Sequence, residues 1–237
     1  MKRFIDLIKK VICPQRCAFC GRVIPAESLM CDECKEKLPR IQKEICMSCG
    51  REKELCSCKG ETYYNCIAAP FYFDGVVRKG IHAYKFRNFP QNHEAYAVET
   101  AKTVSERFGE RKFDYILPVP LTSKRIAERG YDQVALIADK LSELISVECR
   151  KDLLVKLYET DVQHGLSYYL RRGNLTGVFE VADKEAVRGK TILLFDDIST
   201  SGETFNECAK MLWLCDAKEI CCVAVALTKP KKDKNKK

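Results

Sequence analysis

The spacing of apolar residues divides the chain into two parts of different character. Residues 1–60 carry few large apolar side chains, whereas from residue 62 onwards apolar runs of strand length alternate with amphipathic stretches of helical length. Strands that alternate with helices predict an α/β fold, in which a mainly parallel sheet is covered by helices on both faces. Because ligands of such sheets bind beyond the carboxyl ends of the strands, we expect a site in the loops at those ends.

The expected elements follow from this pattern. Strands are expected at 64–73 and 147–156 (one or two in each), at 115–120 (ending in a loop fixed by proline), and at 177–181, 191–195 and 219–227. Helices are expected at 76–86, 93–108, 132–145 and 203–214. Residues 1–12 are basic and amphipathic, but Asp6 interrupts them and the apolar region of a signal peptide does not follow, so we expect a short packing helix there. No run approaches the roughly 18 apolar residues of a membrane span.

Cysteines dominate the first part of the chain. Ten of the fifteen lie within residues 13–66, and eight of those form four close pairs. Two thiolates a few residues apart on a turn can point at one tetrahedral ion, so two pairs complete a closed four-sulfur shell. With no histidine or carboxylate to complete an open catalytic shell, the pattern predicts about two structural Zn²⁺ ions. The expected ligands are Cys17, Cys20, Cys31, Cys34, Cys46, Cys49, Cys56 and Cys58.

The order in which the pairs combine stays open in the sequence. Sequential pairing places the four cysteines of 17–34 on one ion and the four of 46–58 on the other, and interleaved pairing is the alternative; Cys13 and Cys66 are then spare. Clustered cysteines favour metal over disulfides and a reducing, cytoplasmic compartment. We therefore expect a helix and double zinc-ribbon domain at 1–60, a second domain at 61–228, and a disordered lysine-rich tail at 229–237.

The net charge of +8 is unevenly distributed. The tail, with six lysines and one aspartate, supplies +5 and residues 1–60 supply another +5, so residues 61–228 carry −2. Eight thiolates on two Zn²⁺ ions would lower the charge of the whole chain to +4. The second domain is therefore not a basic body, and contact with nucleic acid would depend on local patches and on the tail, whose alternative role is that of a solubilising end.

The segment 192–204 concentrates unusual chemistry. Four apolar residues lead into Asp196 and Asp197, and a turn of hydroxyl and glycine residues follows before the next expected helix. Backbone N–H groups at a helix start bind phosphate, hydroxyls add hydrogen bonds, and Gly202 allows close approach of the backbone. The two carboxylates would repel phosphate but accept hydrogen bonds from sugar hydroxyls. A phosphorylated ribose fits this combination better than a simple acidic turn does.

This segment, ILLFDDISTSGET, resembles the phosphoribosyl-pyrophosphate (PRPP) motif of type I phosphoribosyltransferases over its whole length. The resemblance implies a sheet of that type, in which Asp196 and Asp197 bind the ribose hydroxyls. By the same resemblance the loop of Pro118, Val119 and Pro120 corresponds to the pyrophosphate loop. The residues that would cradle the 5′-phosphate are Ser199, Thr200, Ser201, Gly202, Glu203 and Thr204.

Further segments resemble the ComF competence-protein family. They are PVPL at 118–121, RGYDQ at 129–133, TDVQ at 160–163 and RRGNLTGVF at 171–179, with the cysteine pairs in front. Together they cover essentially the whole chain. The sequence departs from the family pattern at Asp132, where asparagine is common, and at Tyr158, which with Lys156 stands where basic residues are frequent. The resemblance implies a cytoplasmic protein that acts in DNA uptake and natural transformation.

Cationic residues complete the expected site. Lys124, Arg125 and Arg129 follow the proline loop and would neutralise a pyrophosphate together with Mg²⁺. Arg129 is the principal candidate because a pyrophosphate needs a fixed charge nearby; its alternative role is that of a solvated arginine at a helix end. Arg129 and the two aspartates form the expected catalytic set, and Lys85 is a further candidate for the same pocket.

Two functions are compatible with these residues. The first is a ComF-like protein that holds PRPP and acts in DNA uptake, with single-stranded DNA and other competence proteins as partners and no stable membrane insertion. The second is an active phosphoribosyltransferase, unrelated to DNA, that transfers the phosphoribosyl group of PRPP to a nucleobase or amine. No segment identifies an acceptor, so the sequence does not decide whether the protein is an enzyme.

Overall fold

The computed structural model describes residues 14–56, 58, 61–87, 89–157 and 178–230. Several expectations fall outside these residues: the helix at 1–12, the spare Cys13, the TDVQ segment, most of the RRGNLTGVF segment, and the tail from residue 231 onwards. Within the described ranges, no helix combines the length and the apolar character that crossing a membrane requires.

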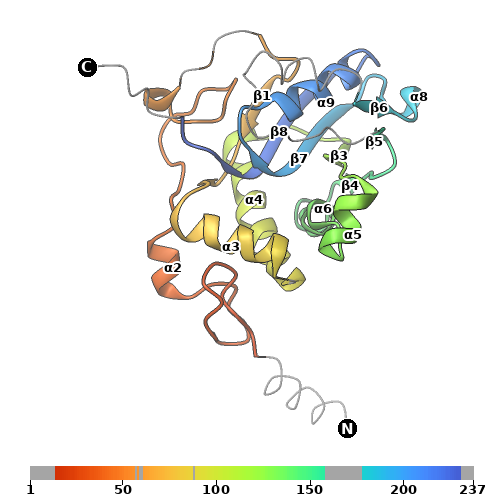
Figure 1. Cartoon of the computed structure of the whole chain (residues 1–237). Coiled ribbons are helices and arrows are strands. Elements are labelled where there is room, and N and C mark those ends of the chain that lie inside the picture. Colours follow the sequence, from red (N-terminus) through yellow and green to blue (C-terminus); the bar gives the residue numbers. More distant parts are fainter. Residues whose placement is uncertain (1–13, 57, 59–60, 88, 158–177, 231–237) are drawn as a thin grey trace, which may run out of the picture.

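A parallel sheet forms the centre of the molecule (Figure 1). Its strands lie in the order β1-β8-β7-β3-β4, and β2 pairs with the end of β8 beyond β1; all of these pairings are parallel. The expected α/β class is therefore confirmed. The strands are β1 Cys66–Ala68, β2 Phe71–Tyr72, β3 Tyr115–Pro118, β4 Glu148–Cys149, β7 Thr191–Ser199 and β8 Glu219–Leu227, and a separate antiparallel pair consists of β5 Leu154–Lys156 and β6 Phe179–Val181.

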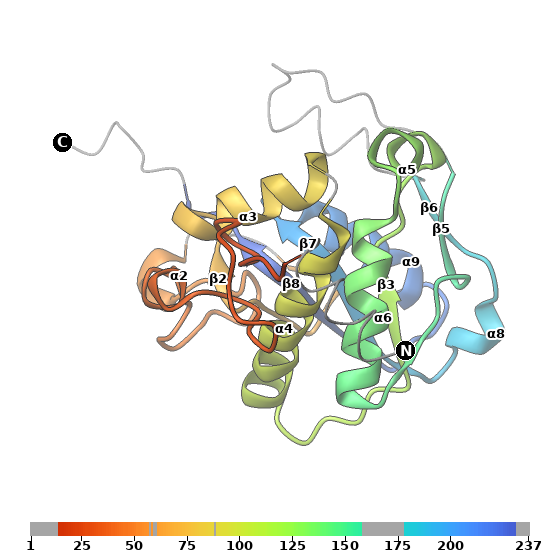
Figure 2. The ribbon, with the colours of Figure 1, turned by 90° about the horizontal axis from the view of Figure 1, so that it is seen from below.

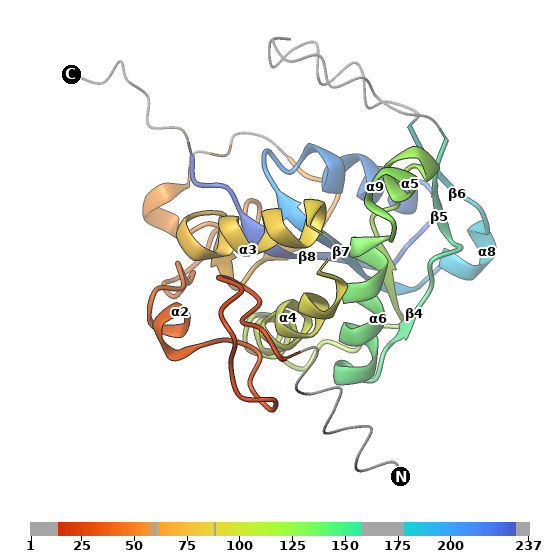
Figure 3. The same cartoon turned by 60° about the horizontal axis from the view of Figure 1, so that its bottom comes forward.

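Helices cover both faces of this sheet (Figures 1 and 3). On one face α4 and α6 pack side by side, and α3 joins them through the rings of Tyr84 and Tyr96, whose centroids are 5.4 Å apart. The other face is covered by α9. The long helices are α3 Gly75–Phe86, α4 His93–Phe108, α6 Gln133–Ile145 and α9 Glu203–Trp213; the short ones are α2 Asp32–Glu36, α5 Ser123–Arg129 and α8 Lys184–Val187, with 3₁₀ turns at Lys53–Leu55 and Pro90–Asn92.

The position of the two central strands, β7 and β8, explains why their sequences are apolar without interruption. Every side chain of β7 from Ile192 to Phe195 is buried, as is every side chain of β8 from Ile220 to Leu227. Successive side chains of a strand point to opposite faces, so a strand covered by helices on both sides needs apolar residues at all positions. The continuous apolar runs in the sequence are therefore the central strands of the sheet.

One expected boundary is wrong in a way that affects the site. Strand β7 was expected to end at Phe195 but continues to Ser199, because β8 keeps pairing with it: Asp196 is opposite Ala224 and Ser199 is opposite Leu227. Local sequence favoured a turn at the carboxylates, and the neighbouring strand overrides that preference. The acidic residues therefore lie on a strand, and the turn begins only at Thr200.

The cysteine-rich segment packs against the sheet domain at several places (Figure 2), two of which lie beside cysteine pairs. Near the first cysteine pair, the Tyr96 hydroxyl and Asn92 Nδ2 both donate to the carbonyl of Ala18, at 3.1 and 3.2 Å. Near the third pair, the Tyr64 hydroxyl donates to the carbonyl of Ser48 at 2.7 Å. These contacts satisfy buried backbone carbonyls of the small segment with donors from the larger one.

Gly50 and Gly21 offer a matched test of this packing. Each follows the second cysteine of a pair, and each has positive φ, 69° and 75° respectively, where alanine is strained. A Cβ atom at Gly50 would also lie 2.8 Å from Leu227 Cδ1 and 3.0 Å from the carbonyl oxygen of Ile67, whereas at Gly21 nothing lies within 4 Å. We expect Gly50→Ala to lower the free energy of unfolding by roughly 2–4 kcal/mol and Gly21→Ala by about 1 kcal/mol. Urea unfolding of the zinc-loaded variants measures both, and equal losses would contradict the packing described.

Candidate functional site

The carboxyl ends of β3 and β7 meet at one edge of the sheet. Pro118 is paired with Phe195, and the Val119 N–H donates to the Phe195 carbonyl at 2.8 Å. The proline loop (Pro118, Val119 and Pro120) is therefore a direct neighbour of the acidic pair (Asp196 and Asp197). Ligands of parallel sheets bind at this edge, so the fold brings together the two loops that carry the expected pyrophosphate and ribose contacts.

Asp197 forms an ion pair with a residue from another element. It is 5 % exposed, and Lys85 Nζ of α3 lies 2.8 Å from its Oδ1 and 2.7 Å from its Oδ2. A buried carboxylate is costly unless it is paired and hydrogen-bonded. Lys85 therefore compensates the charge of Asp197 and is the cation that the structure brings to the acidic pair.

Asp196 lies next to this ion pair, and its carboxyl group has a raised pKa. Its Oδ1 accepts a hydrogen bond from the Asp197 N–H at 2.7 Å. Burial raises the pKa of Asp196 to about 7, the negative charge of Asp197 adds to the rise, and Lys85 and Lys156 oppose it. Near neutral pH the side chain of Asp196 is therefore divided between the protonated and the ionised form, so it can donate or accept a hydrogen bond.

The turn after β7 presents backbone N–H groups at the start of α9. Gly202 is the N-cap of this helix and adopts a left-handed conformation with φ 85°. Thr200 and Ser201 are exposed, and Ser201 Oγ accepts from the Glu203 N–H at 3.5 Å. Exposed hydroxyls beside a helix N-terminus suit an anion. Ser199, by contrast, is 6 % exposed within β7, so the structure places it behind the turn.

Two more of the expected phosphate contacts lie in the first turn of α9. Glu203 and Thr204 are half-buried, and the buried Oε1 atom of Glu203 has no hydrogen-bond partner among the described residues. An unsatisfied buried acceptor calls for a donor. A ligand hydroxyl or a bound water at the turn would supply one.

Arg51 of the cysteine-rich segment holds the turn from outside. Its Nη2 donates to the carbonyl of Thr200 at 2.5 Å, and its Nε donates to the carbonyl of Thr228 at 2.7 Å. The corresponding arginine of the first cysteine cluster, Arg22, instead pairs with Glu33 at the surface, at 2.9 Å. Sequence reasoning missed Arg51, because an arginine after a cysteine pair carries no sign of which loop it will reach.

Helix α5 begins directly after the proline loop and carries the three expected cations, Lys124, Arg125 and Arg129. The guanidinium of Arg129 lies 5.6 Å from the ring centre of Phe86, the residue that follows Lys85 on α3. No ion pair joins Arg129 to the acidic pair within the described part of the chain. The structure thus places Arg129 beside α3 near Lys85, and not on the carboxylates themselves.

A cavity of about 260 Å³ opens beside the proline loop, between the start of α6 and β5. Asp132 lines it and has a structural role: its Oδ1 accepts from the N–H groups of Val134 and Ala135, at 3.0 and 2.8 Å, and so caps α6 as asparagine would. Lys156 also lines this cavity, and its charge lowers the pKa of Asp196. Lys156 therefore belongs to the site, although it was not among the expected binding residues.

The eight paired cysteines form two groups of four. Within each group the sulfur atoms lie within 4.8 Å of one another, and the groups are Cys17, Cys20, Cys31 and Cys34, and Cys46, Cys49, Cys56 and Cys58. The pairing is therefore sequential. Burial by itself would raise the pKa values of Cys17 and Cys46, but hydrogen bonds to their sulfurs outweigh it and lower each to about 7. A closed set of four sulfurs with a ready thiolate fits structural zinc.

The raised pKa of Asp196 has a consequence for stability. The folded protein keeps a proton that the unfolded chain releases between about pH 4 and pH 7, so Asp196 lowers the stability as the pH rises through this window. Asp196→Asn removes this titration, so its stability relative to wild type should be about 2–3 kcal/mol more favourable at pH 8 than at pH 5. Asp114→Asn is the control, because the Thr191 N–H lowers the pKa of Asp114 and moves its titration below this range. A pH-independent difference for Asp196→Asn would contradict the assignment.

Comparison with known proteins gives relatives along most of the chain. Residues 8–67 match the family described as double zinc ribbon domain. The chain is 28 % identical over 224 residues to Competence protein F of Haemophilus influenzae, and the aligned region covers 86 % of this chain and 93 % of that protein. It is 26 % identical over 203 residues to DNA utilization protein YhgH of Escherichia coli O157:H7, with 83 % of each chain covered.

Among solved structures, the chain is similar to the glutamine phosphoribosylpyrophosphate amidotransferase from B. subtilis. The TM-score is 0.41 at 18 % identity, over 61 % of this chain and 30 % of that one. The resemblance to the ComF competence proteins rests on the sequence relatives together with the two cysteine clusters and the parallel sheet. It is confirmed: the chain is a homologue of the ComF competence proteins, with a double zinc ribbon in front of its α/β domain.

Proposed function

We propose that the protein binds PRPP at the carboxyl edge of its sheet and acts in the uptake and handling of DNA in the cytoplasm. The observation that carries the first half is the position of the acidic pair on β7, immediately before a turn of exposed hydroxyls and the N-terminus of α9. Carboxylates accept hydrogen bonds from a sugar, and the helix start donates them to a phosphate. Ribose 5-phosphate needs both, next to each other.

Each part of the ligand has a counterpart in this arrangement. The acidic pair would hold the ribose hydroxyls, and the turn 200–204 would hold the 5′-phosphate. The proline loop and the cations of α5 would face the pyrophosphate, with Mg²⁺ sharing the neutralisation of its charge. Among the cations of α5 we assign the pyrophosphate to Arg129, because its guanidinium lies against Phe86 of α3, the helix that also carries Lys85.

Lys85 gives this site a means of exchanging partners. Without ligand its ammonium group neutralises Asp197. A ribose hydroxyl that donates to Asp197 would weaken this ion pair and allow Lys85 to turn towards the negative pyrophosphate. A buried ion pair contributes little net stability compared with its parts in water, so the exchange is energetically possible.

The second half of the proposal comes from the relatives. One is named a competence protein and the other a DNA utilization protein, and each is matched over more than four fifths of its length. We extend that role to this chain, with single-stranded DNA and other competence proteins as partners. Catalytic transfer of the phosphoribosyl group is the second candidate, favoured by cations placed to stabilise a departing pyrophosphate beside a held ribose.

Calorimetric titration of the protein with PRPP in the presence of Mg²⁺ tests the site. Wild type should bind, and Asp197→Asn should bind at least tenfold more weakly because a charged acceptor for a ribose hydroxyl is lost. Asp183→Asn is the matched control, since its side chain caps α8 through the Ala186 N–H and asparagine caps equally well.

Absence of binding at millimolar PRPP would refute the pocket assignment. Release of pyrophosphate over a panel of nucleobases and amines, measured on the same samples, separates the two candidate functions. Binding without release supports a PRPP-holding protein, and release that Asp197→Asn abolishes supports the transferase.

Arg51 links the second cysteine cluster to the phosphate turn, and its loss should act on ligand binding. Arg51→Ala removes the donors that hold the carbonyls of Thr200 and Thr228, so we expect PRPP affinity to fall about fivefold or more. Arg22→Ala, at the corresponding position of the first cluster, should leave the affinity unchanged. Metal analysis should give about two zinc ions per chain for both variants. Equal affinities of the two variants would show that the turn does not depend on Arg51.

A further inference from the structure

A second hollow lies along α9. It has a volume of about 900 Å³ and is bounded by residues 61–65, by Asn206 and Trp213 of α9, and by residues 217–220 at the start of β8. Strands β1 and β8 begin here, so this is the amino edge of the sheet and not the carboxyl edge. Asn206 lies near the start of α9 and Trp213 is its last residue, so the hollow extends along the helix. At 1.5 Å per residue, its aromatic end lies about 16 Å from the N-cap Gly202.

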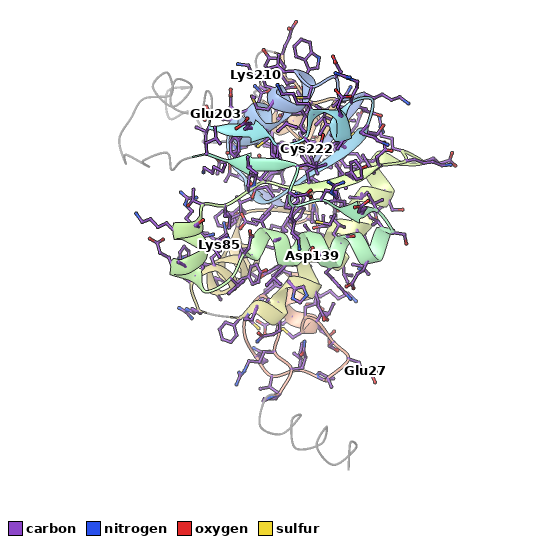
Figure 4. All side chains as sticks on the ribbon, turned by 90° about the vertical axis from the view of Figure 1, so that its right-hand side faces the viewer. Glu27, Lys85, Asp139, Glu203, Lys210 and Cys222 are labelled. Carbon is purple, nitrogen blue, oxygen red and sulfur yellow. The ribbon has the colours of Figure 1, made fainter. Side chains whose placement is uncertain are left out.

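One wall of the hollow is an exposed aromatic surface. The rings of Tyr63 and Trp213 are in contact, with centroids 5.7 Å apart, and they are 40 % and 56 % exposed. Lys210 Nζ lies 5.9 Å from the centre of the Tyr63 ring. Figure 4 shows Lys210 on the α9 side of the sheet, across from Lys85 of the carboxyl-edge site. Two exposed rings with an adjacent ammonium group resemble the surfaces on which bases stack.

The other wall is polar and rich in donors. Asn206 Oδ1 accepts from the Tyr63 N–H, and Asn65 Oδ1 accepts from the Ile220 N–H, each at 2.9 Å. These bonds fix both amide groups, and neither Nδ2 atom has a hydrogen-bond partner among the described residues. Lys218 adds an exposed ammonium group at the rim. Two carboxylates also line the hollow: Glu219 forms an ion pair with Arg111 at 2.9 Å, and Glu61 is exposed to solvent.

We propose that this hollow binds single-stranded nucleic acid, with bases stacked on Tyr63 and Trp213 and with Lys210, Lys218 and the two amides donating to phosphate and base oxygens. The rings are too exposed for a small-molecule pocket, which buries most of its ligand. The donor-rich wall suits acceptors on a nucleotide better than an apolar protein surface. That the bound nucleic acid is DNA rests on the proposed function. That bases stack on Tyr63 and Trp213 rests on the geometry of the hollow alone.

Trp213 is the only tryptophan of the chain, so its fluorescence reports on this surface alone. Oligo(dT) added to the full-length, zinc-loaded protein at low salt should quench the Trp213 emission as bases stack on the ring. By anisotropy of a labelled oligonucleotide, Tyr63→Ala and Trp213→Ala should each weaken binding about tenfold, and Lys210→Ala by a smaller factor with a reduced salt dependence. Leu144→Ala, which truncates an exposed side chain of α6, should leave binding unchanged.

Three outcomes would overturn the proposal. Binding of oligo(dT) without any change in Trp213 emission, or with equal affinity in the ring variants, would place the strand elsewhere. Equal quenching by thymidine monophosphate at the same nucleotide concentration would make the hollow a mononucleotide site. If neither the Trp213 emission nor the oligonucleotide anisotropy responds to any nucleotide, the aromatic surface does not bind nucleic acid and is available to a protein partner. Repeating the titration with Asp197→Asn keeps the result independent of PRPP, because that variant should retain full quenching even if the carboxyl-edge site fails.

Discussion

The parallel pairing of β7 with both β3 and β8 fixes where each group of the candidate site lies. Pairing with β3 ends at Pro118 and Phe195, so the proline loop leaves the sheet beside the acidic pair. Pairing with β8 continues to Ser199 and Leu227, which carries Asp196 and Asp197 out on a rigid strand. Groups held on strands keep their positions more precisely than groups on loops. The turn of hydroxyls then needs to span only the short step into α9.

The cysteine-rich segment contributes more than a separate folded unit. Through Arg51 its second cluster binds the carbonyls at Thr200 and Thr228, one in the phosphate turn and one just after β8. Through Tyr64 and Ser48 it is tied to the segment that passes Gly202. A metal centre that orders residues 46–58 therefore also orders one side of the turn. In this chain the zinc ribbon and the candidate ligand site are mechanically connected, which suggests why the two occur in one polypeptide.

The periodicity of apolar residues was sufficient to predict the bounds of long helices and strands but not the contacts between them. The helix at 93–108 and the strand at 219–227 have the expected bounds because each contains a complete amphipathic or apolar pattern between clear breaks. The end of β7 was missed because it depends on β8, which is distant in sequence. The proximity of Lys85 to Asp197 and the reach of Arg51 depend on how helices and loops pack across the sheet edge, and spacing within a segment carries no record of that. The sequential grouping of the cysteines was likewise decided only by the fold.

If the carboxyl edge of β7 holds a phosphorylated ribose, a crystal structure of the protein soaked with PRPP and Mg²⁺ should show it there. We expect ribose density within hydrogen-bonding distance of Asp196 and Asp197, the 5′-phosphate at the N–H groups of residues 200–204, and Lys85 released from Asp197. Density for the ligand at any other place, or an unaltered Lys85–Asp197 ion pair with an empty turn at saturating PRPP, would contradict it.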